Sequence, residues 1–334
     1  MQTPRKTDMD LWSLADLATP WSLYTVATLN VASHLDSGPT PISDLAAACE
    51  ADPDALARVL RQLISKGIFA EPEPGTFALN DNARGLLDPG LRFGLNLDGF
   101  GGRMVYPWST LPKAVRTGRS AYVEVYGRSF WEDLDAHPEL AAEFDAMMGP
   151  AGHGAPDRDV LINRAEWSGI GTVVDVGGGS GSLLAAILRA HPRVRGTLVD
   201  LPRTVARSRE IFEPARLLDR VTLSPQSFFD ALPSGRDLYL LSKVLDDWPD
   251  AEAKRILARC AEAARPNGRV IAVNGVTPEP VASPELMMLV LVGGKNRTLE
   301  EFRVLAREAG LEVSAAGRNP NGRFQVECRA IIAK

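Results

Sequence analysis

Short apolar runs alternate with helical segments through the second half of this chain. The alternation starts at Val173 and predicts βα units, in which helices join parallel strands. Apolar, β-branched runs of this length are typical of buried strands. The predicted strands cover residues 173–176, 196–200, 221–223, 238–242 and 270–273, and residues 311–315 and 324–333 predict a final antiparallel pair. We therefore expect an α/β domain built on a mostly parallel sheet.

The N-terminal segment carries apolar residues at helical spacing. Residues 8–35 predict two apolar helices that are split near Pro20. Their large apolar side chains are Leu11, Trp12, Leu14, Leu17, Trp21, Leu23, Val26 and Leu29. An isolated helix pair cannot bury so much apolar surface, so it must pack on another part of the chain or on a second copy. A homodimer formed through these helices is our hypothesis.

Residues 41–80 have the pattern of a winged helix. Helices are predicted over residues 43–50 and 53–65, followed by a hairpin around Pro74 and Gly75. A winged helix can bind DNA, but DNA binding depends on Lys and Arg at the phosphates. Residues 1–100 hold 7 Lys and Arg against 13 Asp and Glu, a net charge of −6. We therefore predict a dimerisation module and no nucleic-acid partner.

The segment between these two regions is predicted to be helical and is rich in large side chains. Residues 99–158 would link a first domain, residues 1–98, to the α/β domain, residues 159–334. Small-molecule sites often lie between domains. The substrate pocket is predicted to be lined from this segment and from residues 284–296, by Trp108, Phe144, Met147, Met148, Met287, Met288 and Leu291.

The first predicted strand leads directly into a glycine-rich turn. Val173–Val176 is followed by three glycines, Gly177–Gly179. Glycine lets the backbone turn sharply and approach a ligand closely. Asp200 ends the next predicted strand, where a carboxylate can hydrogen-bond the hydroxyls of a ribose. Strand, glycine turn, helix, strand and acid together predict a nucleoside site.

The spacing of the glycines distinguishes a dinucleotide ligand from other nucleosides. A dinucleotide fingerprint has glycine at the sixth position of G-x-G-x-x-G, where this chain has Ser182. Asp175 lies just before the loop, and a nearby anion disfavours a pyrophosphate. A carboxylate there suits a ligand with an ammonium or sulfonium group instead. We therefore expect S-adenosylmethionine rather than NAD, with Asp175 among the cofactor-binding residues.

Composition and charge narrow the classes of protein to which the chain can belong. The chain has 334 residues, 45% of them apolar and 24% charged, and a net charge of −5, which is compatible with a sizeable packed core. No apolar run approaches the roughly 18–20 residues of a membrane span, and the N-terminus has no apolar secretory stretch. Cys49, Cys260 and Cys328 fit no disulfide framework and no metal spacing. We expect a cytoplasmic protein with no metal and no membrane partner.

Seven stretches of the chain carry a family resemblance. They are Trp131–Glu132, Val173–Gly181, Leu198–Pro202, Phe228–Asp230, Leu240–Trp248, Pro266–Arg269 and Gly293–Thr298. In these stretches the chain resembles the class I S-adenosylmethionine-dependent O-methyltransferases of small molecules, of the plant and actinobacterial natural-product type. The resemblance implies a dimeric enzyme with a mainly α, winged-helix-like N-terminal domain. It also implies a Rossmann-like C-terminal domain that holds the cofactor.

The resemblance assigns roles to individual residues. The three glycines of the turn would run along the methionine part of the cofactor, and Asp200 would hold the ribose hydroxyls. Leu201 and Phe228 would pack on the two sides of the adenine. Ser242 stands where the family has a strand-end residue near the methionine carboxylate.

Three positions depart from the family pattern. Where the family has Gly-Asp-Phe-Phe, this chain has Gln226–Phe229, so Ser227 would accept the adenine hydrogen bond in place of Asp. The catalytic His-Asp-Trp of the family is Asp246–Trp248 here, which puts Asp246 in the position of the base. The family's Glu that orients that His is Asn274.

Two side chains are candidates for the general base. A free carboxylate, with a pKa near 3.9, is a weak base for a phenol near 10, but burial would raise the pKa of Asp246. His153, in the loop before the nucleoside domain, is the alternative. The leading interpretation is a methyltransferase that acts at oxygen on a small aromatic or polyketide-like acceptor. The open alternatives are a relative that binds the cofactor for C-methylation or other chemistry, and a non-enzymatic ligand sensor or DNA-binding regulator.

Overall fold

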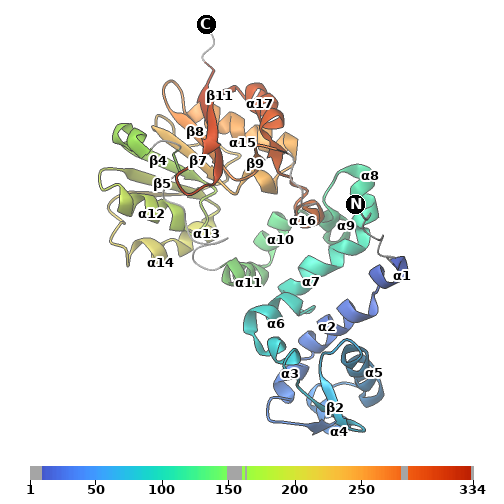
Figure 1. Cartoon of the computed structure of the whole chain (residues 1–334). Coiled ribbons are helices and arrows are strands. Elements are labelled where there is room, and N and C mark those ends of the chain that lie inside the picture. Colours follow the sequence, from blue (N-terminus) through green and yellow to red (C-terminus); the bar gives the residue numbers. More distant parts are fainter. Residues whose placement is uncertain (1–9, 149–159, 162–163, 280–284, 332–334) are drawn as a thin grey trace, which may run out of the picture. The chain divides into compact units, whose positions relative to one another are not determined.

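The chain folds into two compact units. The computed structural model describes residues 10–148, 160–161, 164–279 and 285–331. Contacts separate residues 1–106 from Pro107–Lys334 (Figure 1). Over the ranges just given, no helix combines the length and the apolar character needed to cross a lipid bilayer. The three-segment division at residues 98 and 158 stays a prediction.

The first unit is mainly helical and contains the predicted winged helix. Its described elements are α1 (Leu11–Leu14), α2 (Ala18–Thr28), α3 (Val31–His34), β1 (Thr40–Pro41), α4 (Ile42–Ala48), α5 (Pro53–Ile64), β2 (Ala70–Glu73), β3 (Thr76–Ala78), η1 (Ala83–Leu87), α6 (Pro89–Leu95) and α7 (Phe100–Val105). The side chain of Asp52 caps α5 by accepting a 2.9 Å hydrogen bond from the N–H of Ala55. Strand β3 pairs antiparallel with both β1 and β2, and the fully buried Leu45, Leu60 and Phe77 belong to the unit's core.

The predicted break at Pro20 is wrong. Pro20 is the third residue of α2, and the chain breaks earlier, between Leu14 and Ala18. Proline is tolerated in the first turn because its missing N–H would have no partner inside the helix there. The Asp16 carboxylate accepts hydrogen bonds from the N–H groups of Ala18 (2.9 Å) and Thr19 (3.2 Å), and so defines the start of the helix.

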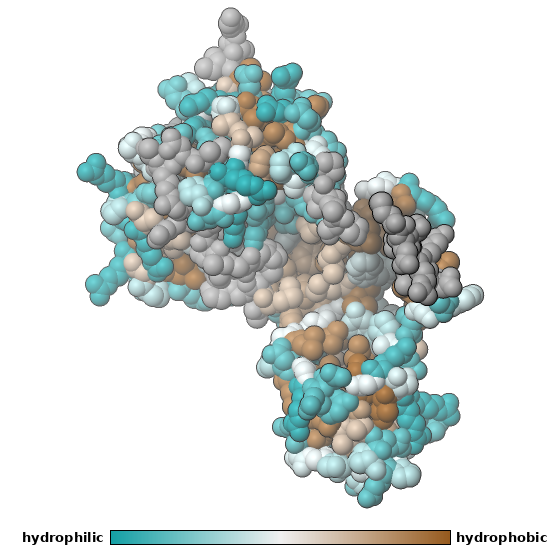
Figure 2. All heavy atoms as spheres, viewed as in Figure 1, coloured by the Kyte–Doolittle hydropathy of each residue, from teal (hydrophilic) through white to brown (hydrophobic). Residues whose placement is uncertain are grey.

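Large apolar side chains at the start of the first unit are exposed. Trp12 is 87% exposed, and Leu11, Leu14 and Leu17 each exceed 60%. Figure 2 shows other apolar residues, in brown, reaching the surface of this unit. The size of the exposed apolar side chains agrees with the predicted need for a covering partner.

The second unit is built on a seven-stranded sheet whose order is β11-β12-β8-β7-β4-β5-β6. Its strands are β4 (Thr172–Val176), β5 (Arg195–Asp200), β6 (Val221–Pro225), β7 (Leu238–Ser242), β8 (Arg269–Val273), β11 (Leu311–Arg318) and β12 (Phe324–Ala330). The first five are parallel, and β12 runs antiparallel to both β8 and β11. All seven predicted strands are confirmed, and so is the final antiparallel pair.

Helices cover both faces of this sheet (Figure 1). The described helices of the unit, with η2 spanning the boundary, are η2 (Tyr106–Thr110), α8 (Leu111–Thr117), α9 (Ala121–Tyr126), α10 (Phe130–Ala136), α11 (Pro138–Met148), η3 (Arg164–Gly169), α12 (Ser182–Ala190), α13 (Pro202–Arg207), α14 (Arg209–Phe212), η4 (Leu245–Asp247), α15 (Asp250–Ala263), α16 (Leu286–Leu291) and α17 (Leu299–Glu308). One core lies under α12, α13 and α14, and the other under α15 and α17.

Two short strands lie outside the main sheet. Strands β9 (Val276–Thr277) and β10 (Arg297–Thr298) pair in parallel, and α17 follows β10 directly. Thr298 and Glu301 form a capping box at the start of α17, in which each side chain accepts a hydrogen bond from the other's backbone N–H, at 3.3 and 2.8 Å. The parallel strands of the main sheet end at one edge, where α/β folds place their ligands.

Candidate active site

The glycine turn after β4 requires its glycines for two different reasons. Gly177, Gly179 and Gly181 have φ angles of 70°, 59° and 86°, which side chains rarely allow. Gly178 has no such φ, but an added Cβ would lie 2.6 Å from the carboxyl carbon of Asp175. Helix α12 begins at Ser182, because the left-handed backbone at Gly181 cannot belong to the helix.

Asp200 ties the end of β5 to this turn. Its Oδ2 accepts a 2.8 Å hydrogen bond from the N–H of Gly179, and its Oδ1 accepts a 2.7 Å bond from the N–H of Leu201. Burial raises the pKa of Asp200, while these two hydrogen bonds act in the opposite direction. The carboxylate is therefore held in one orientation at the strand end where the sequence predicts a ribose contact.

Asp175 lies beneath the glycine turn and is only 1% exposed. Burial, and then the charge of Asp200, raise the pKa of Asp175 to about 7, although a hydrogen bond from the Leu184 backbone partly opposes this. Among the described residues, its Oδ2 atom has no hydrogen-bond partner. A buried acceptor without a partner costs free energy, so this atom is suited to a positively charged ligand group.

A cavity of about 550 Å³ opens at the glycine turn. The nine residues predicted to bind the cofactor all line it, namely Asp175, Gly177, Gly178, Gly179, Asp200, Leu201, Ser227, Phe228 and Ser242. Phe144, predicted for the substrate pocket, lines it as well. The volume falls within the roughly 300–1,000 Å³ of small-molecule sites.

These residues fit an adenosyl group that carries a cation. Leu201 and Phe228 offer apolar surfaces for a base, and Asp200 offers oxygens for ribose hydroxyls. The unpartnered oxygen of Asp175 suits a sulfonium or an ammonium. Because a Cβ at Gly177 would come within 2.8 Å of Val244 and 3.3 Å of Phe228, the turn also packs closely against one wall of the cavity.

The sequence interpretation missed several lining residues. Trp131 supports the family resemblance but received no role, and it lines the cavity beside Phe144. Within the described ranges its buried indole N–H finds no hydrogen-bond acceptor. Arg203 also lines the cavity, and its charge lowers the pKa of Asp200 in opposition to burial. Only the Trp-Glu pair of the family pattern signalled any of these residues.

A second cavity, of about 560 Å³, adjoins the first. The two cavities share Lys243 and Asp247 in their walls. The second is lined by Lys243, Asp246, Asp247, Asn274, Gly275, Val276, Thr277, Pro278, Met288, Asn296, Arg318 and Phe324. It contains the candidate base Asp246 and one predicted pocket residue, Met288.

Burial shifts both acids of the Asp-Asp-Trp turn. It raises the pKa of Asp246, and the charge of Glu285 acts in the same direction. The pKa of Asp247 is raised well above its ordinary value, by burial first and by Asp246 second. No described residue donates a hydrogen bond to Oδ1 of Asp246, which is buried. This carboxyl group is thus a stronger base than a free aspartate, with one oxygen left for a ligand.

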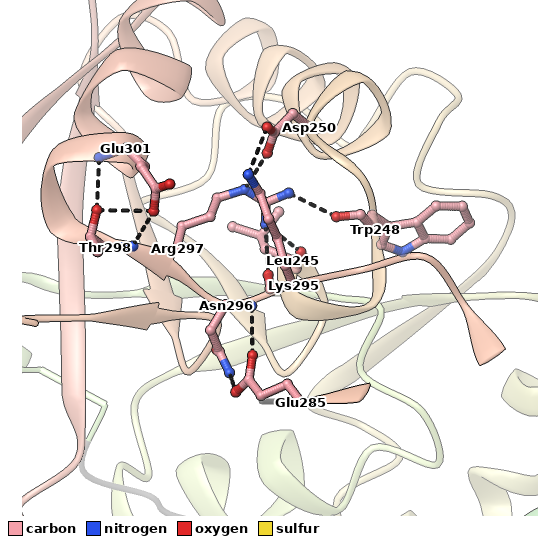
Figure 3. A network of polar contacts seen from close by, with 9 residues as sticks. All are labelled: Leu245, Trp248, Asp250, Glu285, Lys295, Asn296, Arg297, Thr298 and Glu301. Carbon is pink, nitrogen blue, oxygen red and sulfur yellow. Dashed lines mark hydrogen bonds and ion pairs between the residues drawn. The ribbon is translucent and has the colours of Figure 1, made fainter. Parts of the chain in front are cut away.

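A single buried arginine holds this turn in place (Figure 3). Arg297, 1% exposed, donates 2.7 Å hydrogen bonds to the backbone carbonyls of Leu245 and Trp248. Its Nε bonds Oδ1 of Asp250 at 2.9 Å. Burial disfavours the charged form of Asp250, but hydrogen bonds from Lys295 and Arg297 outweigh it and lower the pKa of that carboxyl. The guanidinium thus forms hydrogen bonds with both ends of the turn that carries Asp246.

The backbone of Asp246 is enclosed between two glycines. A Cβ at Gly294 would lie 1.9 Å from the Asp246 carbonyl oxygen, and one at Gly275 would lie 3.1 Å from its nitrogen. Lys243 and Asn274, both in the cavity wall, have left-handed backbones with φ of 56° and 64°. Strained non-glycine residues of this kind cluster at functional sites.

The remaining residues predicted for the substrate pocket or as the base either line neither cavity or lie outside the described residues. Trp108, Met147 and Met287 are exposed on the second unit, at 36%, 43% and 42%, and Leu291 is 9% exposed. The side chain of Met148 and the whole of His153 lie outside the described residues.

Comparisons with known proteins identify the family. The family model of the O-methyltransferase domain matches residues 108–312, and that of the O-methyltransferase dimerisation domain matches residues 12–89. Over 317 residues the chain is 40% identical to a 2,7-dihydroxy-5-methyl-1-naphthoate 7-O-methyltransferase of Streptomyces carzinostaticus, covering 93% of this chain and 95% of that protein. It is also 36% identical to an aclacinomycin 10-hydroxylase of Streptomyces purpurascens, with 94% and 86% covered.

Comparison with solved structures identifies the same family. An O-methyltransferase of neocarzinostatin biosynthesis, in complex with S-adenosylmethionine and 2-hydroxy-5-methyl naphthoic acid, matches with a TM-score of 0.82 and 39% identity over 98% of this chain and 100% of that chain. The fold class and the resemblance predicted from the sequence are confirmed. The chain belongs to the O-methyltransferase family, with the family's dimerisation domain preceding its methyltransferase domain.

Proposed function

We propose that this enzyme transfers a methyl group from S-adenosylmethionine to a hydroxyl of a small aromatic natural product. The observation that carries the proposal is the pair of adjoining cavities that share Lys243 and Asp247. The first presents the glycine turn and Asp200, and the second presents Asp246. The relatives that are named for naphthoate O-methylation support an aromatic acceptor.

Each cavity has one task in the reaction. S-adenosylmethionine supplies a methyl group on a positively charged sulfur and leaves as S-adenosylhomocysteine. The residues around the first cavity hold that donor, and the second cavity holds the acceptor, whose oxygen then forms the new bond to carbon. The hydroxyl proton passes to the carboxylate of Asp246. Positioning supplies much of the acceleration, and proton transfer to a base adds about 10²- to 10⁴-fold.

Two measurements test this function together. Isothermal calorimetry with S-adenosylmethionine should show binding. Incubation with 2,7-dihydroxy-5-methyl-1-naphthoate as a probe acceptor should yield a product heavier by one methylene group, with release of S-adenosylhomocysteine. A product heavier by one oxygen atom would instead group the chain with its hydroxylating relative. Absence of binding to the methyl donor would refute the proposal.

Cofactor affinity is expected to depend on pH through Asp175. With a pKa of about 7 this carboxyl is protonated below neutrality, and a bound cation favours its ionised form. Affinity for S-adenosylmethionine should therefore rise by up to about tenfold from pH 6 to pH 8. Asp175→Asn should flatten the dependence, which calorimetry at several pH values measures. Equal slopes for the variant and the unmodified chain would assign the titration to another group.

The match to a dimerisation domain makes a homodimer through the N-terminal helices our second proposal. The double variant Trp12→Glu, Leu17→Glu should weaken such a dimer about 100-fold or more, since an unpaired charge buried in an interface costs about 3–5 kcal/mol. Light scattering should then give the monomer mass at micromolar protein. Val304→Glu, at an exposed apolar position of the second unit, is the matched control. A monomeric mass for the unmodified chain would contradict the proposal.

A further inference from the structure

A second carboxylate, that of Glu285, contacts a residue in the wall of the second cavity. Glu285 precedes α16, and both of its oxygens accept hydrogen bonds from Asn296 (Figure 3). The backbone N–H of Asn296 donates to Oε2 at 3.2 Å, and its side-chain amide donates to Oε1. Asn296 itself lines the cavity that contains Asp246. The two-point contact fixes the direction in which the Glu285 carboxylate points.

The backbone conformation of Glu285 also indicates that this residue is held in one place. Its φ of 46° and ψ of 33° are left-handed, a conformation that is unfavourable for a non-glycine residue. The contacts with Asn296 offset part of that cost. Met288, one turn further along α16, lines the same cavity. Helix α16 thus contributes Met288 to the cavity wall, and Glu285, just before the helix, contacts the wall residue Asn296.

Asp246 is surrounded by both signs of charge. Negative charge comes from Glu285, on the α16 side. Burial and Asp246 raise the pKa of the neighbouring Asp247, which disfavours a second negative charge there. Positive charge comes from Lys243, at the end of β7, and from Arg297, in β10. Arg297 is engaged with backbone carbonyls and Asp250, and the charge of Lys243 is itself disfavoured by burial and by Arg323. Glu285 is therefore a major contributor to the field at the candidate base.

The usual partner of the base is missing from this chain. The position after β8 holds Asn274, an amide without charge, where the family resemblance leads one to expect an acid. Glu285 reaches the same cavity from a different segment, through Asn296. We infer that Glu285 is a positioning residue for the methyl transfer, which acts through Asp246 by placing a negative charge against it and so keeps Asp246 a strong proton acceptor. The inference rests on the proposed function, because Asp246 has this task only if an acceptor hydroxyl is deprotonated.

A measurement of thermal stability tests the electrostatic effect of Glu285 on Asp246 without any substrate. The ionised form of Asp246 is disfavoured in the folded protein, so its contribution to stability is present at low pH and is lost as pH rises through its raised pKa. Asp246→Asn should therefore gain melting temperature over the unmodified chain as the pH rises from the ordinary pKa of an aspartate, about 3.9, through the raised pKa of Asp246. When both chains also carry Glu285→Gln, the gain in melting temperature from Asp246→Asn should be smaller. Glu300→Gln, an exposed acid on α17, should leave the gain unchanged.

The pH dependence of turnover provides the second readout. With the naphthoate probe acceptor, Glu285→Gln should move the acidic limb of kcat/KM to lower pH and lower the plateau, because a weaker base remains. Circular dichroism confirms that the variant is folded. A stability gain that is the same with and without Glu285 would overturn the inference, even if methyl transfer is observed. A reduced gain in a chain that transfers no methyl group would refute only the proposed function.

Discussion

Replacing Arg297 with methionine is expected to lower the free energy of unfolding by about 3–5 kcal/mol. The guanidinium is buried, and its loss leaves the carbonyls of Leu245 and Trp248 without their donor. Methionine fills much of the space but donates nothing, so the desolvation cost of both carbonyls remains. Urea unfolding followed by circular dichroism measures the change.

The matched control for Arg297 is an arginine at the surface. Arg303 pairs with Glu300 on the exposed side of α17, and Arg303→Met should change stability by less than about 1 kcal/mol. Arg297→Lys separates charge from geometry, because lysine keeps the charge but cannot bond two carbonyls and Asp250 in one plane. It should recover only part of the loss. Equal effects at the two arginines would show that the turn is held by other contacts.

Asp246→Asn is expected to lower kcat by about 10²- to 10⁴-fold. The amide has nearly the shape of the carboxylate but cannot take the hydroxyl proton. The affinity for S-adenosylmethionine should change little, because Asp246 lines the second cavity and not the first. Steady-state kinetics with the naphthoate probe, together with calorimetry for the methyl donor, measure both quantities.

His153→Ala provides the opposing test. If it abolishes turnover while Asp246→Asn does not, the base is the histidine and the proposal for Asp246 is wrong. If both variants keep full turnover, the site works by proximity alone, which is sufficient for an acidic phenol. Loss of methyl-donor affinity in Asp246→Asn would instead indicate that the turn had collapsed.

The local features of this chain were predictable because each follows from neighbouring residues. The apolar run before Gly177 can only be satisfied in a buried strand, and the turn needs residues that tolerate positive φ. The capping box at Thr298 is a four-residue pattern. The predicted cofactor residues lie at the carboxyl ends of strands or just beyond them. Parallel strands end at one edge of the sheet, so the cavity that gathers these residues was implied by the order of elements.

Apolar character alone does not place a side chain. Trp108, Met147 and Met287 were assigned to a pocket because they are large, but size does not say which way a side chain points. The structure leaves them exposed and outside both cavities, and their assignment to the substrate pocket stays a prediction. The break near Pro20 was misplaced for a separate reason. Proline breaks a helix in its interior but not in its first turn, and the competing cap of Asp16 set where the helix began.

The sequence by itself determined the order of strands and helices, the glycine turn and the acid that follows it, since these depend on residues a few positions apart. Only the tertiary structure decided what surrounds the candidate base. Leu245 and Arg297 are joined although 52 residues separate them. Glu285, from another segment, contacts Asn296 in the wall of the cavity that contains Asp246. Such contacts arise when distant segments pack together. Their partners are chosen by the folded geometry and leave no periodic pattern along the chain.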